Sequence, residues 1–131
     1  DRSKDKRKID RPMAYIIKKN QTEIIEKLDI NGIKTITIEN DTTFLAGSYT
    51  VTAFKDDFKI YEKMKMQDVD VRIDYTDIQF SKGDLILPMK QKKSNLIAEL
   101  MEPEAPNSYV SFGLIKTGIN KILPIYRIRE L

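Results

Sequence analysis

The sequence predicts an α+β fold, with a mixed, largely antiparallel sheet and two short helices on one face. Two stretches in the middle of the chain alternate apolar and polar residues with a period of two, as strands with one dry and one wet face do. Such strands favour antiparallel sheets. Two other stretches carry apolar residues at helical spacing, next to residues that can cap a helix. A pure β-sandwich is the alternative fold, and the two helices argue against it.

A strand–helix–strand unit is predicted first along the chain. Met13–Lys18 is expected to form a buried strand, and Asn20 can form a capping box with Glu23, three residues later. The apolar face of the helix then comprises Ile24, Ile25 and Leu28. Gly32 is expected to end this helix, because glycine tolerates the left-handed conformation that follows a helix. The next β-type run contains Ile33, Ile36 and Ile38.

The middle of the chain predicts two strands and a turn. The alternating apolar positions are Tyr49, Val51 and Ala53 in one strand and Val69, Val71, Ile73 and Tyr75 in the other. Between them, Lys55–Gln67 is charged and aromatic, and it fits a hairpin loop, an extension of the strands or a helical turn. Ser81–Asp84 predicts a turn, because Gly83 takes a positive φ at no steric cost.

A second helix is predicted after a short apolar strand. Leu85–Leu87 forms this strand, and Pro88 closes it. Ser94 can cap the helix, whose apolar face comprises Leu96, Ile97, Leu100 and Met101. Pro103 bars its continuation.

Two strands are predicted near the C-terminus. Tyr109, Val110 and Phe112 indicate one of them, and Ile122–Ile128 indicates the other. The last strand is expected at an edge of the sheet, because Pro124 has no backbone N–H to donate to a neighbour.

Charge divides the chain into two parts. Residues 1–11 hold six basic and three acidic side chains, and the whole chain holds 23 basic and 20 acidic ones. The net charge of +3 therefore lies entirely in this opening segment, which we interpret as a charged linker or fray. Residues 12–131 are expected to form a single domain of zero formal charge, unlike a nucleic-acid binder with a basic face. No apolar run is long enough to predict insertion into a membrane.

The chain contains neither histidine nor cysteine. It therefore has no imidazole base and no thiolate nucleophile, and it lacks the two commonest ligands of transition metals. A complete metallohydrolase or triad hydrolase is excluded. We predict no catalytic residue, no metal ligand and no cofactor in this chain.

Four residues near Pro103 are candidates for a functional surface. Glu102 and Glu104 form the nearest approach to a carboxylate pair, which would do acid–base work only if burial separated their pKa values. Loop glutamates beside prolines are more often solvated or structural. Tyr109 and Phe112 can face a neighbouring domain, although core packing is the commoner role of such residues.

The stretch Gly83–Gly113 resembles a segment that follows the catalytic domain in bacterial zinc carboxypeptidases of the carboxypeptidase A-like family. The matching elements are Leu85–Pro88, Gln91, Leu96–Leu100, the Met-Glu-Pro-Glu sequence Met101–Glu104, and Tyr109–Gly113. Arg11–Ile33 also resembles that family's pattern of Arg-Pro-x-Ala-Tyr-Ile-Ile, a glutamine and a late Gly-Ile.

The resemblance implies a non-catalytic C-terminal accessory domain. The family holds zinc with a His-x-x-Glu pair and a later histidine, and no residue here matches those ligands. Zinc would belong to the upstream catalytic domain of the same polypeptide, which is the expected partner. That contact would involve Glu102, Glu104, Tyr109 and Phe112. The resemblance also implies a periplasmic or extracellular location. The alternatives are an independent binding module for cell-wall glycan or peptide and, more weakly, a small carboxylate enzyme.

Overall fold

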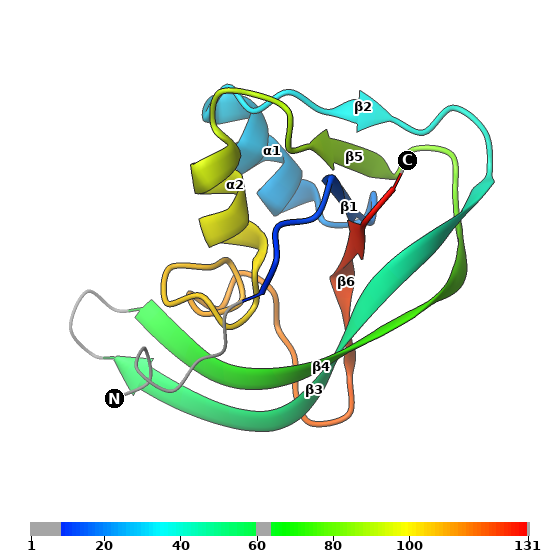
Figure 1. The fold of residues 1–131 in the computed structure, drawn as a ribbon. Helices are drawn as coiled ribbons and strands as arrows, with labels where there is room; N and C mark the ends of the chain where they lie inside the picture. Colours follow the sequence, from blue (N-terminus) through cyan, green and yellow to red (C-terminus); the bar gives the residue numbers. More distant parts are fainter. Residues whose placement is uncertain (1–8, 60–63, 131) are drawn as a thin grey trace.

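A computed structural model describes residues 9–59 and 64–130 of the chain. It contains one six-stranded sheet with the strand order β2-β5-β1-β6-β3-β4 (Figure 1). The strands are β1 (Ala14–Ile17), β2 (Ile36–Thr37), β3 (Thr42–Lys59), β4 (Met64–Phe80), β5 (Leu85–Pro88) and β6 (Ile122–Ile128). Each neighbouring pair is antiparallel. The α+β prediction is therefore confirmed, with a fully antiparallel open sheet in place of a sandwich.

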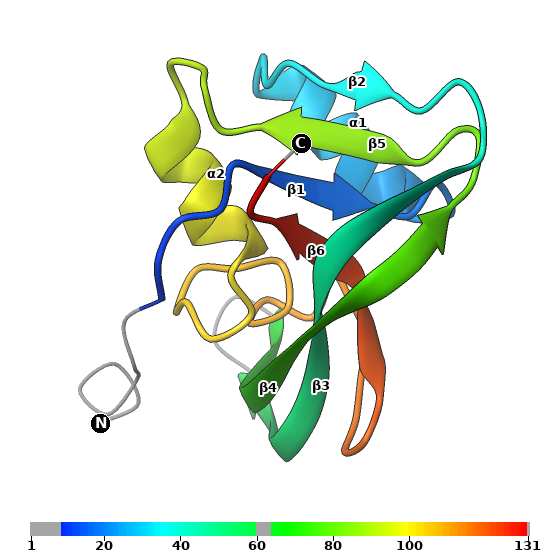
Figure 2. The same cartoon turned by 45° about the vertical axis from the view of Figure 1, so that its right-hand side comes forward.

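Both helices pack on the same face of this sheet. The helices are α1 (Thr22–Ile30) and α2 (Ser94–Met101). Their buried side chains join those of the central strands in the main core, including Ile24, Leu28, Ile97, Met101, Tyr15 and Ile17. Figure 2 shows α1 behind β5 and β1, and α2 to the left of these strands. The alternation along β1 turns Ala14 and Ile16 to the other face, where they join a smaller core around Phe80 and Ile128.

The predicted helix caps are wrong in detail, although both helices exist. Gln21 precedes α1 and Lys93 precedes α2, and neither helix has a side-chain cap hydrogen bond. Asn20 instead accepts a hydrogen bond of 3.2 Å from the Gln21 side chain. The prediction for Gly32 is confirmed: its φ of 71° lets the chain turn, and its N–H bonds the Asp29 carbonyl at 2.9 Å.

The stretch from Lys55 to Gln67 extends the two long strands of the β3–β4 hairpin. Apart from residues 60–63, which lie outside the described residues, all of it belongs to β3 or β4. Val51 pairs with Val71 and Ala53 pairs with Asp70, so Thr52 is an extra residue in β3. Such a bulge increases the local twist of the ribbon. Figure 1 shows the hairpin curving past β6 as a long, coiled ribbon.

The strand predicted at Tyr109–Phe112 is wrong, because this segment belongs to a series of turns between α2 and β6. The buried Gln67 side chain donates hydrogen bonds of 2.8 Å to the carbonyls of Val110 and Ile115. The Gln67 N–H also bonds the Ser111 carbonyl at 2.8 Å. Three carbonyls of the loop are therefore satisfied by Gln67 of β4, and other backbone groups of the loop bond one another in turns, so no partner strand is needed.

The last predicted strand exists as β6, but its expected position at an edge is wrong. β6 lies between β1 and β3. Its pairing with β3 shifts register between Ser48, which faces Tyr126, and Thr50, which faces Ile122. This irregularity spans Pro124, so the missing N–H falls where the ladder is already interrupted. The predicted strand around Ile36 is also shorter than expected, with two residues paired to β5.

Gly47 of β3 is expected to be essential to this packing. A Cβ atom there would lie 2.8 Å from Arg127 Cγ and 2.9 Å from Tyr75 Cζ. Gly47→Ala should therefore destabilise the fold by about 2 kcal/mol, because two packed side chains would have to move. Urea unfolding measures this change. Gly118→Ala is the matched control, since a Cβ there has no neighbour within 4 Å, and it should change stability by less than about 0.5 kcal/mol. Equal effects of the two variants would contradict this account.

Candidate functional site

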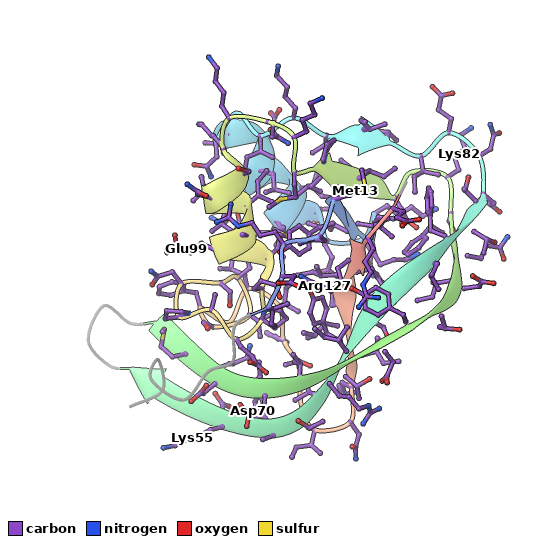
Figure 3. All side chains as sticks on the ribbon, viewed as in Figure 1. Met13, Lys55, Asp70, Lys82, Glu99 and Arg127 are labelled. Carbon is purple, nitrogen blue, oxygen red and sulfur yellow. The ribbon has the colours of Figure 1, made fainter. Side chains whose placement is uncertain are left out.

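A row of residues crosses four strands on the helix-covered face of the sheet. Tyr15 of β1 lies opposite Arg127 of β6, and Arg127 lies opposite Gly47 of β3. Gly47 in turn lies opposite Tyr75 of β4. Since Gly47 has no side chain, the Arg127 side chain can pass over β3 and reach Tyr75. Figure 3 shows Arg127 near the centre of the molecule, close to the crossing of β6 and β3.

The Arg127 guanidinium is buried and hydrogen-bonded on several sides. The residue is 5% exposed. Its Nε donates to Tyr49 Oη at 3.0 Å, and its Nη1 donates to Tyr75 Oη at 3.3 Å. Its Nη2 donates to Glu102 Oε2 at 3.2 Å and also to the Asp10 carbonyl. Burying a guanidinium is costly unless it is paired and hydrogen-bonded in this way.

Glu102 is the carboxylate that balances Arg127. It directly follows α2, and its side chain is 16% exposed. Tyr15 Oη donates a hydrogen bond to Glu102 Oε2, and Tyr49 Oη lies 3.1 Å from both carboxylate oxygens. Glu102, Arg127, Tyr15 and Tyr49 therefore form a buried network, called here the Arg127–Glu102 network. It fastens the end of α2 to strands β1, β3 and β6.

The network holds its members in fixed protonation states. Burial raises the pKa of both Tyr15 and Tyr49 above the ordinary 10.0, and the negative charge of Glu102 raises it further. Burial opposes the charge of Arg127, but Tyr49 and Glu102 outweigh it, so the pKa of Arg127 lies above its ordinary value. Both phenols stay neutral and the guanidinium stays charged near neutral pH. Groups with fixed protonation states can orient and hold neighbouring side chains, but they are poorly suited to exchange protons with a substrate.

The structure places the two predicted glutamates in different surroundings. Glu102 joins the network, while Glu104, which is 8% exposed, accepts a hydrogen bond of 2.9 Å from the Val71 N–H. This N–H lies at the β3 bulge, where pairing shifts between Val51 and Ala53. Glu104 thus anchors the loop to the β4 backbone. The two carboxylates serve separate structural contacts.

The two predicted aromatic residues differ in exposure. Tyr109 is 5% exposed, and its hydroxyl has no hydrogen-bond partner among the described residues. Burial raises the pKa of this phenol. Phe112 is half-buried and offers part of its ring to the surface. Contact of these four residues with a neighbouring domain stays a prediction.

Sequence reasoning missed Arg127, although a signal was present. Leu123, Ile125 and Arg127 share one face of β6 at a spacing of two. An arginine in the apolar phase of a strand indicates a buried ion pair. Its partner Glu102 is 25 residues away in sequence, and no local pattern connects the two.

An arginine-lined hollow lies beside the network. Its volume is about 430 Å³, and its basic residues are Arg11, Arg127 and Arg129. The other lining residues are Ile9, Asp10, Pro12, Ile73 and Tyr75. Arg129 stacks on the Tyr75 ring, with its guanidinium carbon 3.9 Å from the ring centroid. The hollow joins the N-terminal segment to side chains of β4 and β6.

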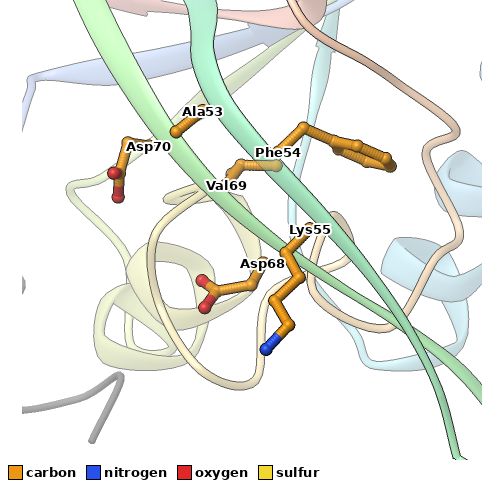
Figure 4. A pocket seen from close by; sticks show the side chains of 6 residues that line it. All are labelled: Ala53, Phe54, Lys55, Asp68, Val69 and Asp70. Carbon is orange, nitrogen blue, oxygen red and sulfur yellow. The ribbon is translucent and has the colours of Figure 1, made fainter.

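A second hollow, of about 220 Å³, lies on the hairpin. Figure 4 shows its lining side chains, which are Ala53, Phe54, Lys55, Asp68, Val69 and Asp70. Along β4, Asp68, Asp70 and Asp74 share one face, and Asp74 pairs with Arg72 at 2.8 Å. No group of three or more carboxylates placed to hold a metal ion occurs among residues 9–59 and 64–130. Within the same ranges, no helix has the length and apolar character needed to span a membrane.

Comparison with known proteins finds that the chain is similar to fungal carboxypeptidases. It is 26% identical over 118 residues to Carboxypeptidase 2 of Trichophyton tonsurans, and over 119 residues to Carboxypeptidase 2 of Trichophyton rubrum. The chain is distantly similar to part of a carboxypeptidase. These alignments cover 90% and 91% of this chain but 22% of each relative.

The similarity stops short of a family assignment. No family model matches the chain. No solved structure matches it either. The carboxypeptidases that it resembles are fungal, so the bacterial setting expected from the sequence stays a prediction. What is shared is a region about a fifth as long as Carboxypeptidase 2.

Removal of the Glu102 charge should destabilise the fold strongly. Glu102→Gln would leave the buried Arg127 guanidinium without its counter-charge, at an expected cost of about 3 kcal/mol. Urea unfolding at neutral pH measures this cost. Glu99→Gln is the control, because Glu99 is exposed on α2 and accepts a hydrogen bond of 2.8 Å from the Asn107 side chain. A loss below about 0.5 kcal/mol for Glu102→Gln, typical of a surface change, would contradict the role assigned to this pair.

The network also predicts loss of stability in alkali. Tyr15 and Tyr49 have raised pKa values in the folded state, whereas unfolded tyrosine ionises near pH 10. The unfolded chain therefore gives up protons that the folded chain keeps, so the stabilisation is full below pH 10 and falls as the pH rises above it. The urea midpoint should decrease above pH 10, and the decrease should be shallower in Tyr15→Phe. Identical pH dependence in the two proteins would contradict this expectation.

Proposed function

We propose that this chain is a non-catalytic accessory domain of a zinc carboxypeptidase-like protein. In this role it packs against an upstream catalytic domain of the same polypeptide, stabilises that domain and shapes access of the substrate. The zinc and its ligands belong to the catalytic domain. The proposed setting of the whole protein is periplasmic or extracellular.

The alignment with Carboxypeptidase 2 carries this proposal. Almost the whole of this chain aligns, yet the aligned part is 22% of the relative. A region that corresponds to one structural unit of a longer peptidase is consistent with an accessory domain. The absence of histidine from the sequence also supports it, because the zinc ligands of the carboxypeptidase A-like family include histidines.

The proposed contact with the catalytic domain centres on the loop after α2. Phe112 is half-buried there and has ring surface left to cover. Tyr109 lies in the same loop, and its hydroxyl lacks a hydrogen-bond partner among the described residues. Glu102 and Glu104 hold this loop against the sheet. Their part in the proposed contact is to present the loop in one conformation.

An independent module for cell-wall glycan or peptide is the alternative from the sequence. An exposed row of aromatic side chains would favour it, because aromatic rings are common platforms for ligands. Where the structure describes aromatic side chains, they are buried or half-buried. Among the residues whose burial the structure describes, the exposed large apolar ones are Met13, Ile30, Ile36, Leu45, Ile119 and Ile122. Of these, only Ile119 lies between α2 and β6, so the burial of the described aromatic side chains, and not this set, argues against a glycan module.

Deletion of residues 12–131 from the longer protein should lower its thermal stability and its rate of peptide cleavage. The reading frame upstream of Asp1 should encode a His-x-x-Glu motif and a distant histidine. Peptide cleavage and thermal unfolding measure the effect of the deletion. An unchanged rate after deletion, or a complete gene that begins near Asp1, would overturn the proposal.

A pair of variants tests the docking surface itself. Phe112→Ala should destabilise the longer protein more than it destabilises the isolated chain, because it removes an interdomain contact as well as local packing. Phe44→Ala is the matched control, since Phe44 is a half-buried aromatic residue that packs against the smaller core on the other face of the sheet. This control should lower the stability of the longer protein and of the isolated chain by the same amount. If Phe112→Ala also destabilised the two proteins equally, the interface would lie elsewhere.

A further inference from the structure

The arginine-lined hollow has the size of a small-ligand site. Its volume of about 430 Å³ lies within the range of such pockets, which is roughly 300–1,000 Å³. Ile9, Pro12 and Ile73 supply apolar walls, and Tyr75 supplies an aromatic one. A site with these walls can hold a carbon body as well as a charged group.

The charges that face the hollow are mostly positive. Three arginines and one aspartate, Asp10, line it, so its formal charge is +2. Glu102 lies next to Arg127 but is already engaged by Arg127, Tyr15 and Tyr49. The phenol of Tyr75 receives a hydrogen bond from Arg127 and underlies Arg129. Because Glu102 balances Arg127 and Asp10 offsets one further arginine, the hollow and its ion pair together keep one uncompensated positive charge, which an anion that enters would meet.

Two of the guanidinium groups are held in place before any ligand arrives. Arg127 makes four hydrogen bonds, one from Nε, one from Nη1 and two from Nη2, out of its five N–H donors. One Nη1–H therefore has no acceptor among the described residues. Arg129 stacks on Tyr75, which restricts its side chain. Fixed donors bind an anion at a lower entropic cost than flexible ones.

We propose that this hollow binds the carboxylate of a small organic acid. The planar guanidinium groups match the two oxygens of a carboxylate, and the apolar walls contact the carbon body of the acid. Inorganic phosphate shares the charge but has no carbon body to bury. An aromatic acid such as benzoate should therefore bind more tightly than acetate or phosphate. This site is independent of the proposed accessory role, and the failure of either proposal leaves the other standing.

The test titrates the isolated chain with benzoate, acetate and phosphate at constant ionic strength, followed by NMR of the backbone amides. Benzoate should bind saturably and perturb Arg11, Ile73, Tyr75 and Arg129. Arg129→Gln and Arg11→Gln should each weaken benzoate binding about tenfold, because each removes one charge from the hollow. Arg127 is left unchanged, since it also holds the fold.

Arg72→Gln is the matched control. Arg72 is an exposed arginine on the opposite face of β4, paired with Asp74. It lowers the net charge of the chain equally but should leave benzoate affinity within about twofold. No saturable binding of benzoate, equal weakening by all three variants, or phosphate binding tighter than benzoate binding would each overturn the proposal. Thermal unfolding of each variant without ligand confirms that it is folded.

Discussion

The ion pair between Arg127 and Glu102 is the interaction on which the rest of this structure depends. A guanidinium buried on the central strand of a sheet is strongly unfavourable without a carboxylate partner and further acceptors. The fold meets this requirement with residues from every part of the chain. Tyr15 and Tyr49 complete the hydrogen bonds, and Gly47 leaves the space through which the arginine passes. The position of α2 follows, because its last turn must deliver Glu102 to the sheet.

The loop between α2 and β6 is a second consequence of the same constraint. Once Glu102 is fixed, Glu104 can reach the Val71 N–H at the β3 bulge. Gln67 then satisfies two carbonyls of the loop from the neighbouring strand. Side-chain hydrogen bonds to the sheet and backbone turns within the loop thus replace a strand ladder over this irregular segment. A loop held at so many points is a rigid surface, which suits the docking role proposed for Phe112.

The functional conclusions rest on separate observations. The distant similarity to Carboxypeptidase 2 supports a structural part of a larger peptidase. The arginine-lined hollow supports a site for an organic anion, and it follows from geometry and charge alone. The stability of the fold and the proposed anion site both depend on Arg127, because this residue belongs to the Arg127–Glu102 network and also lines the hollow. Any change at Arg127 would therefore affect stability and binding together.

Local features of the fold could be predicted from the sequence. The period-two pattern around Tyr49 and Val71 identified strands β3 and β4, and glycines at positions 32 and 83 identified two turns with positive φ. The helix caps were harder, because several polar residues at each helix start compete for one role. Only part of the candidate site could be predicted from the sequence. Glu102 could be singled out from its motif, but Arg127 could not be matched to it by any local pattern.

The sequence by itself determined the two helices and most of the strands, and it excluded histidine- and cysteine-based chemistry from this chain. Those properties depend on neighbouring residues or on composition. Only the tertiary structure decided that β6 is central, that Tyr109–Phe112 forms turns, and that Glu102 is a buried counter-ion. Each of these depends on contacts between residues far apart in the chain. Such contacts are set by the packing of the whole sheet, which no local pattern encodes.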